Sequence, residues 1–466
     1  MVQRKKPLYK MNKSIPQILK GSCVDLSFEG KGVFKSNKDV VFIDGMFPGE
    51  EGEIEITYKR NGALFGKIKK LTKVSKDRIE PKCKVCSACG GCCFQQLSYD
   101  AQLEYKTKKV KEQFSKIAKM DIKVNPCIGM DDPYFYRNKI QMPFGKDNKG
   151  NPYCGFYKSN THVIVPIDTC YIEDIRAKHI LDAIKKLLKS FRIEPYIEDE
   201  RWGILRHVLI KTSFYKKQIM VVLVTAVDVF PSRNNFVKAL IKECPEITTI
   251  IQNINTRDTN VILGEKQRIL YGKGYIEDTL CGVNFQISAK SFYQTNPVMT
   301  EKLYSYAIDK AELTKEDIAF DAYSGIGTIG LIASRKAKEI ISVELVKEAV
   351  IDGIKNAKRN NITNFKMYND DASSFMVRMA TNKQEVDVLF MDPPRKGSDK
   401  RFLDALLKLK PKRVVYVSCD PTTLARDVAY ISKSYAIKDI QPFDMFPHTF
   451  HVETITLLCR KDVKNS

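Results

Sequence analysis

The chain has 466 residues, 43% of them hydrophobic, which is enough for two or three domains that each bury a core. Its 77 lysines and arginines outnumber its 55 aspartates and glutamates and give a formal net charge of +22. Such an excess favours a polyanionic partner, nucleic acid first, although a lysine-rich proteome would give the same balance. No apolar run approaches the roughly 20 residues that cross a membrane, which argues against a membrane protein.

The first residues, MVQRKKPLYKMNK, are basic but lack the apolar stretch of a secretory signal peptide. The chain has 13 cysteines, and several of them crowd between residues 83 and 93. Clustering of this kind in a chain without a secretion signal favours metal binding over disulfides. We therefore expect a cytoplasmic protein, and we expect it to be a monomer.

Residues 1–72 predict a small β-barrel. Short strand-like runs alternate with turns roughly every ten residues, and FPGEEG at 47–52 has the composition of a turn. Small barrels with basic loops often bind RNA, but many only pack against a neighbouring domain.

Residues 73–282 predict a central α+β domain, with a polar helix at 100–119 and strand-like runs such as 206–212 and 218–227. The region opens with the cysteine cluster CKVCSACGGCC, in which cysteines recur every three residues. That spacing suits either zinc or an iron–sulfur cluster. The x3-C-P continuation of a ferredoxin-type run is absent, so a fourth ligand must come from elsewhere in the chain.

Residues 283–466 predict an α/β domain of the Rossmann-like kind. Strand-like runs alternate there with helical stretches, which is typical of a parallel sheet with helices on both faces. The runs are 319–321, 339–344, 364–368, 386–392 and 413–418.

The first of these strands leads into a glycine loop, DAYSGIGTIG at 321–330, which precedes a helix. Glycines let the backbone approach a ligand closely, and Glu344, at the end of the next strand, can bind ribose hydroxyls. The third glycine, Gly330, also fits the dinucleotide fingerprint of NAD proteins. The D-x-x-x-G-x-G form with Tyr323 inside the loop is more typical of S-adenosylmethionine sites, so we favour that cofactor over NAD.

Two further strands end in residues that could bind a ligand or take part in catalysis. Asp392 opens the motif DPPRKG at the carboxyl end of its strand, where open α/β sheets bind ligands. Enzymes that methylate exocyclic amino groups also carry a DPP loop, but with an aromatic residue after the prolines, where this chain has Arg395. Cys419 directly follows the apolar run 413–418, whereas a core cysteine would lie inside such a run.

The position of Cys419 suits a nucleophile. Carbon 5 of uracil is a poor nucleophile, and adding a thiolate to carbon 6 turns carbon 5 into an enolate carbon that can attack a methyl sulfonium. A base must then remove the carbon 5 proton so that the thiol leaves, and Glu453 is the candidate. The alternatives are a buried structural thiol and a solvated edge carboxylate. His448 and His451 could also act as bases, but we favour structural roles for both.

The motifs SCDPTTLARD at 418–427, DPPRKG at 392–397 and DMFPHT at 444–449 resemble the RNA uracil-5-methyltransferase family. The resemblance is strongest to the bacterial 23S ribosomal RNA branch. It runs from the N-terminal barrel, which is similar to a TRAM domain and OB-like, nearly to the end of the chain. It implies that Cys419 is the nucleophile and that Glu453 is the proton-abstracting base.

The resemblance also implies a cofactor site. Gln294, in the motif SFYQTNP, matches a contact near both cofactor and uracil. Tyr323, Glu344 and Asp392 fall on positions that line the S-adenosylmethionine site of the family. Some members carry phenylalanine at the position of Tyr323, and either ring can pack on the cofactor.

The ribosomal RNA branch holds a [4Fe–4S] cluster through a C-x5-C-G-G-C pattern and a distant cysteine. In this chain the pattern implies the ligands Cys83, Cys89, Cys92 and Cys170. Cys86 and Cys93 are additional cysteines that leave the ligand set open, and zinc is the less favoured alternative.

The sequence therefore predicts a three-part enzyme that uses S-adenosylmethionine to methylate carbon 5 of a uridine in 23S ribosomal RNA. Transfer RNA as substrate is a variant that the barrel and the cysteine cluster disfavour, since related transfer-RNA enzymes typically lack both. RNA cytosine-5-methyltransferases use the same thiolate chemistry but usually carry a second cysteine beside the position of Asp392. A non-catalytic iron–sulfur RNA-binding protein would need neither Cys419 nor Glu453.

Overall fold

The structure is a computed structural model that describes residues 17–37, 39–159, 161–259 and 261–462. The basic N-terminal stretch and the start of the predicted barrel region lie outside the described residues. The chain forms two compact units. Unit 1 comprises Met1–Ser87, Gly91–Tyr105 and His448–Phe450, and unit 2 comprises Ala88–Gly90, Lys106–Pro447 and His451–Ser466. The division into three domains at residues 72 and 282 stays a prediction.

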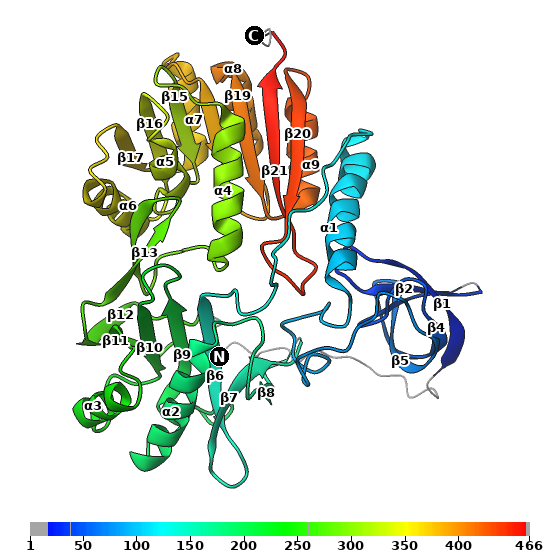
Figure 1. Cartoon of the computed structure of the whole chain (residues 1–466), viewed down its shortest axis with the longest axis vertical. Coiled ribbons are helices and arrows are strands. Elements are labelled where there is room, and N and C mark those ends of the chain that lie inside the picture. The colour runs from blue at the N-terminus through cyan, green and yellow to red at the C-terminus, as the bar shows by residue number, and fades with distance from the viewer. Residues whose placement is uncertain (1–16, 38, 160, 260, 463–466) are drawn as a thin grey trace, which may run out of the picture. The chain divides into compact units, whose positions relative to one another are not determined.

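Unit 1 contains a closed five-stranded barrel, drawn in blue in Figure 1, which confirms the predicted N-terminal barrel. Its strands are β1 (Ile18–Leu26), β2 (Gly32–Ser36), β3 (Asp39–Ile43), β4 (Glu51–Arg60) and β5 (Ala63–Lys73), in the order β1-β2-β3-β5-β4. Alternate residues point inward along the strands, so that Phe34, Val41 and Ile54 meet in a small buried core. Closure leaves no exposed strand edge on so short a sheet.

The predicted polar helix is α1 (Tyr99–Gln113), followed by a short π-helix at Phe114–Ala118. The segment His448–Phe450 returns to unit 1, where the His448 carbonyl accepts hydrogen bonds of 3.0 Å from the N–H groups of Cys93 and Phe94. The five residues of the π-helix extend the helical stretch to Ala118, close to the predicted end at 119.

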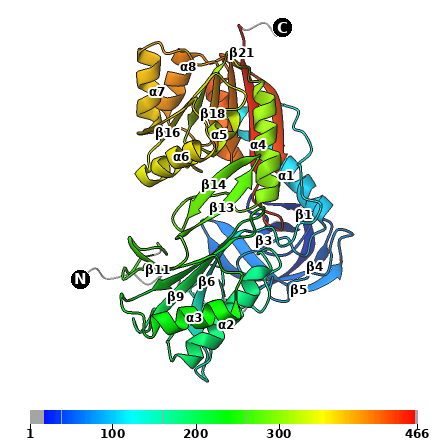
Figure 2. The same cartoon turned by 60° about the vertical axis from the view of Figure 1, so that its left-hand side comes forward.

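Unit 2 contains a seven-stranded sheet in the order β12-β11-β10-β9-β6-β7-β8. Its strands are β6 (Lys139–Lys146), β7 (Pro152–Tyr157), β8 (Ile164–Pro166), β9 (Leu205–Thr212), β10 (Ile219–Thr225), β11 (Thr249–Ile254) and β12 (Lys266–Tyr271). The helices α2 (Arg176–Ser190) and α3 (Arg233–Glu243) lie on one face of this sheet (Figure 2). The apolar residues of α2 recur at helical spacing, as in Ile180, Ile184 and Leu187, and this stripe packs on the sheet.

The residues of β9 and β10 are buried throughout, because both faces of the sheet are covered. Val208 and Ile210 pack with α2 and α3, whereas Leu209 joins the core on the other face. That second core includes the antiparallel hairpin of β13 (Tyr275–Leu280) and β14 (Val283–Ser288).

A second seven-stranded sheet has the order β17-β16-β15-β18-β19-β21-β20. Its strands are β15 (Ile318–Ala322), β16 (Glu339–Glu344), β17 (Phe365–Asn369), β18 (Val388–Met391), β19 (Arg413–Ser418), β20 (Tyr435–Phe443) and β21 (Glu453–Arg460). The first five of these are parallel to one another, and β21 runs antiparallel between β19 and β20. The strand order reverses between β15 and β18, and such a switch point is where α/β sheets bind ligands.

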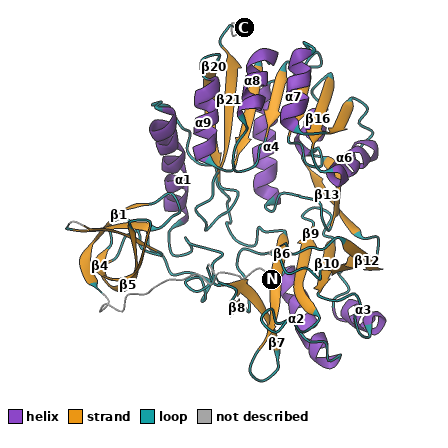
Figure 3. Cartoon of the chain, turned by 180° about the vertical axis from the view of Figure 1, so that it is seen from behind, coloured by secondary structure: helices purple, strands orange, loops and turns teal. Residues whose placement is uncertain are grey.

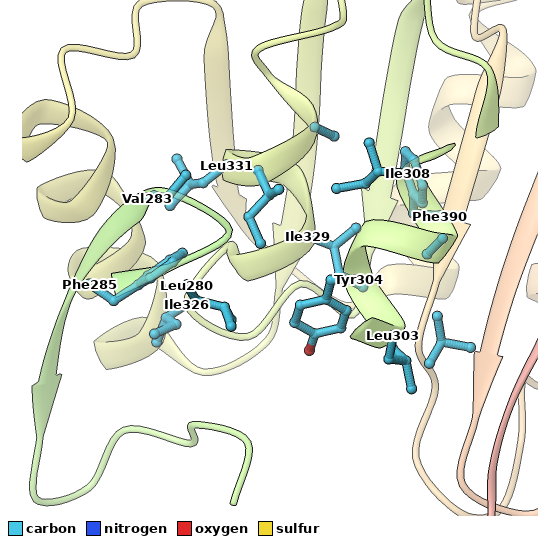
Figure 4. Close-up of a cluster of buried hydrophobic side chains, with 14 of the residues drawn as sticks. Leu280, Val283, Phe285, Leu303, Tyr304, Ile308, Ile326, Ile329, Leu331 and Phe390 are labelled. Carbon is cyan, nitrogen blue, oxygen red and sulfur yellow. The ribbon is translucent and has the colours of Figure 1, made fainter. Parts of the chain in front are cut away.

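Helices cover both faces of this sheet, which confirms the predicted Rossmann-like arrangement. They are α4 (Pro297–Ala311), α5 (Thr328–Ala333), α6 (Lys347–Arg359), α7 (Ala372–Thr381), α8 (Lys400–Leu409) and α9 (Pro421–Ile431). The first three pack on one face, and α7, α8 and α9 pack on the other, which faces the viewer in Figure 3. Figure 4 shows the core beside α4, in which Tyr304, Ile308 and Phe390 meet.

The helices among the described residues include none that is both long enough and apolar enough to cross a membrane.

Candidate active site

A cavity of about 780 Å³ lies in unit 2 at the carboxyl edge of the C-terminal sheet. All six residues that the sequence assigned to catalysis and cofactor binding line it, and they come from five strand ends and one loop. They are Gln294, Tyr323, Glu344, Asp392, Cys419 and Glu453. The parallel strands deliver four of them, because side chains that follow parallel strands meet at one edge.

The glycine loop after β15 forms one wall of the cavity. The Glu344 carboxylate accepts hydrogen bonds from the backbone N–H groups of Gly325 at 2.9 Å and Val346 at 2.8 Å. Gly325 has φ of +57°, and a Cβ added there would meet no other atom within 4 Å. The loop therefore offers exposed backbone next to a fixed carboxylate, which fits the ribose end of an adenosine cofactor.

Asp321 stabilises the end of this loop through a hydrogen bond. It is buried, and its carboxylate accepts a hydrogen bond of 3.0 Å from the Gly330 N–H group at the start of α5. Burial raises the pKa of Asp321 to about 7. A Cβ added at Gly330 would lie 2.9 Å from the same carboxylate, so glycine is needed there for close packing of helix against strand.

The register of β19 and β21 brings Cys419 and Glu453 to the same end of the sheet. Ser418 pairs with Thr454 across these antiparallel strands, and Cys419 and Glu453 are the next residues outward on each strand. Glu453 is only 8% exposed, and Cys419 is half-buried. The nucleophile and the base predicted from the sequence thus enter the cavity from neighbouring strands.

Charges and burial set the proton equilibria of this cluster. Burial, and after it the nearby Glu453 and Asp392 carboxylates, raise the pKa of the Cys419 thiol to about 12, while Arg395 acts in the opposite direction. Burial, and after it the charge of Asp392, raise the pKa of Glu453 to about 8, although the positive charge of Arg395 lowers it. Burial raises the pKa of Asp392 to about 7. At neutral pH the Cys419 thiol is protonated, and the carboxyl groups of Asp392 and Glu453 titrate near neutrality, where proton transfer in either direction is easiest.

The loop that carries Gln294 is anchored by polar contacts. The Asn138 side chain donates a hydrogen bond of 3.0 Å to the Gln294 carbonyl, and its backbone N–H group donates one of 2.9 Å to the Thr295 carbonyl. Asn296 caps α4 by accepting a hydrogen bond from the Met299 N–H group. The Gln294 amide lies 3.5 Å from the hydroxyl of Tyr304, a buried residue that also lines the cavity.

Several residues that line the cavity were not predicted from the sequence, or were predicted to have another role. Arg395 was noted only as a departure from amino methyltransferases, yet it lines the cavity and acts on both reactive groups. Phe446 and His451 also line it. Burial and then Arg395 lower the pKa of His451 to about 4, so this imidazole is neutral at pH 7. His448 instead lies in unit 1, with its ring nitrogen Nδ1 3.4 Å from the Gln102 amide.

The predicted cluster cysteines divide between the units, Cys83 and Cys92 in unit 1 and Cys89 and Cys170 in unit 2. Within unit 1, the Gln95 amide oxygen accepts a hydrogen bond of 3.2 Å from the Cys83 N–H group, and its nitrogen donates one of 3.6 Å to the Cys92 sulfur. One side chain thus links the backbone of Cys83 to the sulfur of Cys92.

A different group of metal-ligand types was not foreseen. Among the described residues, ligand atoms of His179, Cys244 and Glu246 lie within 4.8 Å of one another. His179 Nδ1 lies 3.1 Å from the Glu246 carboxylate, which is also the distance of an ordinary ion pair.

Comparisons with known proteins find similarity to RNA methyltransferases. The model of the family described as tRNA (Uracil-5-)-methyltransferase matches residues 98–461. An uncharacterized RNA methyltransferase of Listeria monocytogenes is 41% identical over 97% of this chain and 98% of its own. An uncharacterized RNA methyltransferase of Clostridium tetani is 38% identical over 96% of this chain and 98% of its own. Among solved structures, the Pyrococcus abyssi tRNA (uracil-54, C5)-methyltransferase in complex with S-adenosyl-L-homocysteine is 25% identical, with a TM-score of 0.75 over 94% of this chain and 100% of that one.

Proposed function

Because the chain belongs to the RNA uracil-5-methyltransferase family and is an S-adenosylmethionine-dependent RNA methyltransferase, we propose that it methylates carbon 5 of a uridine in 23S ribosomal RNA, with Cys419 as nucleophile and Glu453 as base. The observation that carries the proposal is the pairing of β19 with β21, which puts this thiol and this carboxyl group in one cavity with the residues expected to bind the cofactor.

The cavity fits S-adenosylmethionine. The Glu344 carboxylate would bind the ribose hydroxyls, the open backbone at Gly325 would lie against the ligand, and the Tyr323 ring would pack on it. Gln294 and Asp392 would face the reacting end. When bound, the cofactor supplies a methyl group on a positively charged sulfur, which is an electrophile.

The protein would activate the uracil in three steps. The Cys419 thiolate adds to carbon 6, and the electron pair of the C5=C6 bond moves to form an enolate. Carbon 5 then forms a bond to the methyl carbon, and the bond between that carbon and the sulfonium sulfur breaks. Glu453 takes the proton from carbon 5, the electron pair restores the C5=C6 bond, and the Cys419 sulfur leaves.

The raised pKa of Cys419 opposes its role as a thiolate, whereas that of Glu453 suits its role as a base. Cys419 must lose its proton to react, and the positive charge of Arg395 favours that loss. Glu453 must be ionised to accept a proton, and its raised pKa lets it release that proton again near neutral pH. The target base must be flipped out of a helix or be single-stranded to reach the cavity.

One feature supports ribosomal RNA as the substrate, namely the cysteine cluster that the resemblance associates with that branch. We propose that the cluster binds [4Fe–4S] through Cys83, Cys89, Cys92 and Cys170. A uridine of transfer RNA is the second candidate, which is favoured by the likeness to a solved transfer-RNA enzyme over 94% of this chain.

The test uses purified full-length protein, methyl-labelled S-adenosylmethionine, and unmodified 23S ribosomal RNA and transfer RNA as separate substrates. We expect label in 5-methyluridine of the ribosomal RNA with the wild type and none with Cys419→Ala. Label in transfer RNA alone would reject the ribosomal substrate, and label in cytidine would reject the uracil chemistry.

A further inference from the structure

The turn between β9 and β10, residues 213–218, presents two aromatic rings and two lysines to solvent. Phe214 is 37% exposed and Tyr215 49%, and Lys216 and Lys217 are exposed as well. The two rings lie edge to face with centroids 5.1 Å apart, and the Lys217 ammonium group is 4.9 Å from the centroid of the Phe214 ring. Single exposed apolar residues are common, but adjacent rings flanked by cations form a surface with specific binding chemistry.

A buried carboxylate fixes the backbone of this turn. Asp278 of β13 has no exposed surface, and its two oxygens accept hydrogen bonds from the N–H groups of Phe214 at 2.7 Å and Tyr215 at 2.8 Å. Hydrogen bonds to a charged acceptor are stronger than neutral ones. The backbone beneath both rings is therefore held in one conformation.

Further contacts fix both ends of the turn. The Arg176 guanidinium donates hydrogen bonds of 3.1 Å to the carbonyls of Ser213 and Lys217. The Tyr215 hydroxyl donates a hydrogen bond to the Glu301 carboxylate on α4. A surface that is already ordered loses little conformational entropy when it binds a ligand.

The turn lies beside the active-site cavity. Lys211, near the end of β9, donates hydrogen bonds of 2.8 Å to the carbonyls of Ser288 and Ser291, and both serines line the cavity. Phe214 follows three residues later, which is at most about 10 Å of extended chain. A polynucleotide whose target base enters the cavity would have its neighbouring nucleotides within reach of the turn.

We infer that this turn binds a single-stranded RNA segment adjacent to the target uridine. The bases stack on Phe214 and Tyr215, while Lys216 and Lys217 neutralise phosphates, which is the combination that single-strand binding surfaces use. The inference rests on the proposed function and adds to it a substrate-binding surface outside the cavity. Aromatic rings distinguish this surface from one that only attracts an acidic protein.

The test measures binding of a labelled short oligouridine and of a 23S ribosomal RNA transcript to the full-length protein without S-adenosylmethionine, and KM and kcat for methyl transfer. In Phe214→Leu/Tyr215→Leu the surface stays apolar but loses its aromatic faces. We expect Kd for both RNAs and KM to rise roughly tenfold, with kcat unchanged.

The lysines are tested through salt dependence. In Lys216→Gln/Lys217→Gln the slope of log Kd against log salt for the oligouridine should fall by up to about 1.4, at about 0.7 for each phosphate that is no longer neutralised. Lys238→Gln/Lys242→Gln removes the same charge from exposed residues of α3 and should leave the slope unchanged.

Tyr215→Phe separates stacking from folding, because it keeps both rings and removes only the hydrogen bond to Glu301. It should bind RNA nearly like the wild type, because the hydrogen bonds from Arg176 and to Asp278 still hold the backbone of the turn. The inference is overturned if the double leucine variant binds both RNAs with wild-type Kd, or if Tyr215→Phe weakens binding equally. Since RNA binding is measured without the cofactor, these results decide the inference even if no methyl transfer is found, which would count against the proposed function instead.

Discussion

Ser418 of β19 pairs with Thr454 of β21 in antiparallel register, and this single pairing puts Cys419 and Glu453 at the same end of the sheet. At the other end of the same two strands, Arg413 pairs with Cys459. Cys459 is therefore a second half-exposed cysteine on these strands. It lies five residues after Thr454 and is not among the residues that line the cavity.

Cys459 provides a matched control for the nucleophile. We expect Cys419→Ala to lower methyl transfer at least a thousandfold, because Cys419 is the one cysteine among the described residues that line the cavity. Cys459→Ala should keep wild-type activity. Covalent trapping gives an independent readout, since RNA with 5-fluorouridine has no carbon 5 proton to lose. Wild type and Cys459→Ala should form a stable adduct with it that survives denaturation, and Cys419→Ala should form none.

Glu453→Gln should stop the reaction after methyl transfer. The amide is nearly isosteric with the carboxyl group but cannot accept the carbon 5 proton, so the methylated adduct on Cys419 cannot be released. We expect turnover to fall at least a hundredfold, and ordinary uridine RNA to accumulate as a covalent complex in denaturing gels. If turnover falls and no complex accumulates, Glu453 acts before the adduct forms and is not the base for this proton.

The same substitution should affect stability in a pH-dependent way. The pKa of Glu453 is raised from an ordinary value of 4.5 to about 8 in the folded protein. Between these values the folded state binds more protons than the unfolded state, so this group lowers the free energy of unfolding as pH rises from 4.5 to 8. We expect Tm of Glu453→Gln to exceed that of the wild type by a few degrees at pH 8.5, with a smaller difference at pH 5. Equal differences at both pH values would contradict a buried, raised-pKa carboxyl group.

Arg395 should set the pH range of activity. Its charge lowers the pKa of both Cys419 and Glu453, so its removal raises both values and moves the acid limb of kcat/KM to higher pH. Arg395→Gln should be impaired most at pH 7 and recover in part at pH 9. Arg395→Lys keeps the charge and should stay near the wild-type profile. A uniform loss of activity at every pH in Arg395→Gln would show that the guanidinium binds substrate without tuning these groups.

The local pattern was sufficient to predict the residues that end strands. Asp392 and Cys419 each follow a buried apolar run, and parallel strands bring their carboxyl ends to one edge, so their convergence followed from sequence order alone. Asn138 and Tyr304 could not be found in this way. Asn138 lies in a loop before β6 and reaches the Gln294 loop only through tertiary packing, and Tyr304 occupies an apolar position of α4 that is typical of a core residue. In the central sheet only the pairing of β9 with β6 was equally out of reach, since the other neighbouring strands of this sheet follow one another in the chain.

Glu344 is expected to carry much of the cofactor affinity. Glu344→Gln keeps an oxygen that can accept a hydrogen bond from the Gly325 N–H group but loses the charge that strengthens bonds to ribose hydroxyls. We expect Kd for S-adenosylhomocysteine to rise roughly ten- to a hundredfold by calorimetry. Glu339→Gln, at the opposite end of β16 where it pairs with Lys366, should leave Kd unchanged. Wild-type affinity in Glu344→Gln would move the ribose site away from this loop.

The cysteines supply the last prediction. If Cys83, Cys89, Cys92 and Cys170 hold [4Fe–4S], the protein purified without oxygen should be brown and carry about four irons per chain, and each Cys→Ser variant should lose most of them. Gln95→Ala should also lower iron retention, because this amide joins the Cys83 backbone to the Cys92 sulfur.

Cys244→Ser is the matched control, since Cys244 lies with His179 and Glu246 in the other group of metal-ligand types. It should keep all of the iron. Loss of iron from Cys244→Ser, together with full retention in Cys83→Ser and Cys170→Ser, would show that the metal binds to the group of His179, Cys244 and Glu246 instead. Zinc in place of iron in the wild type would keep the ligand set but reject the iron–sulfur assignment.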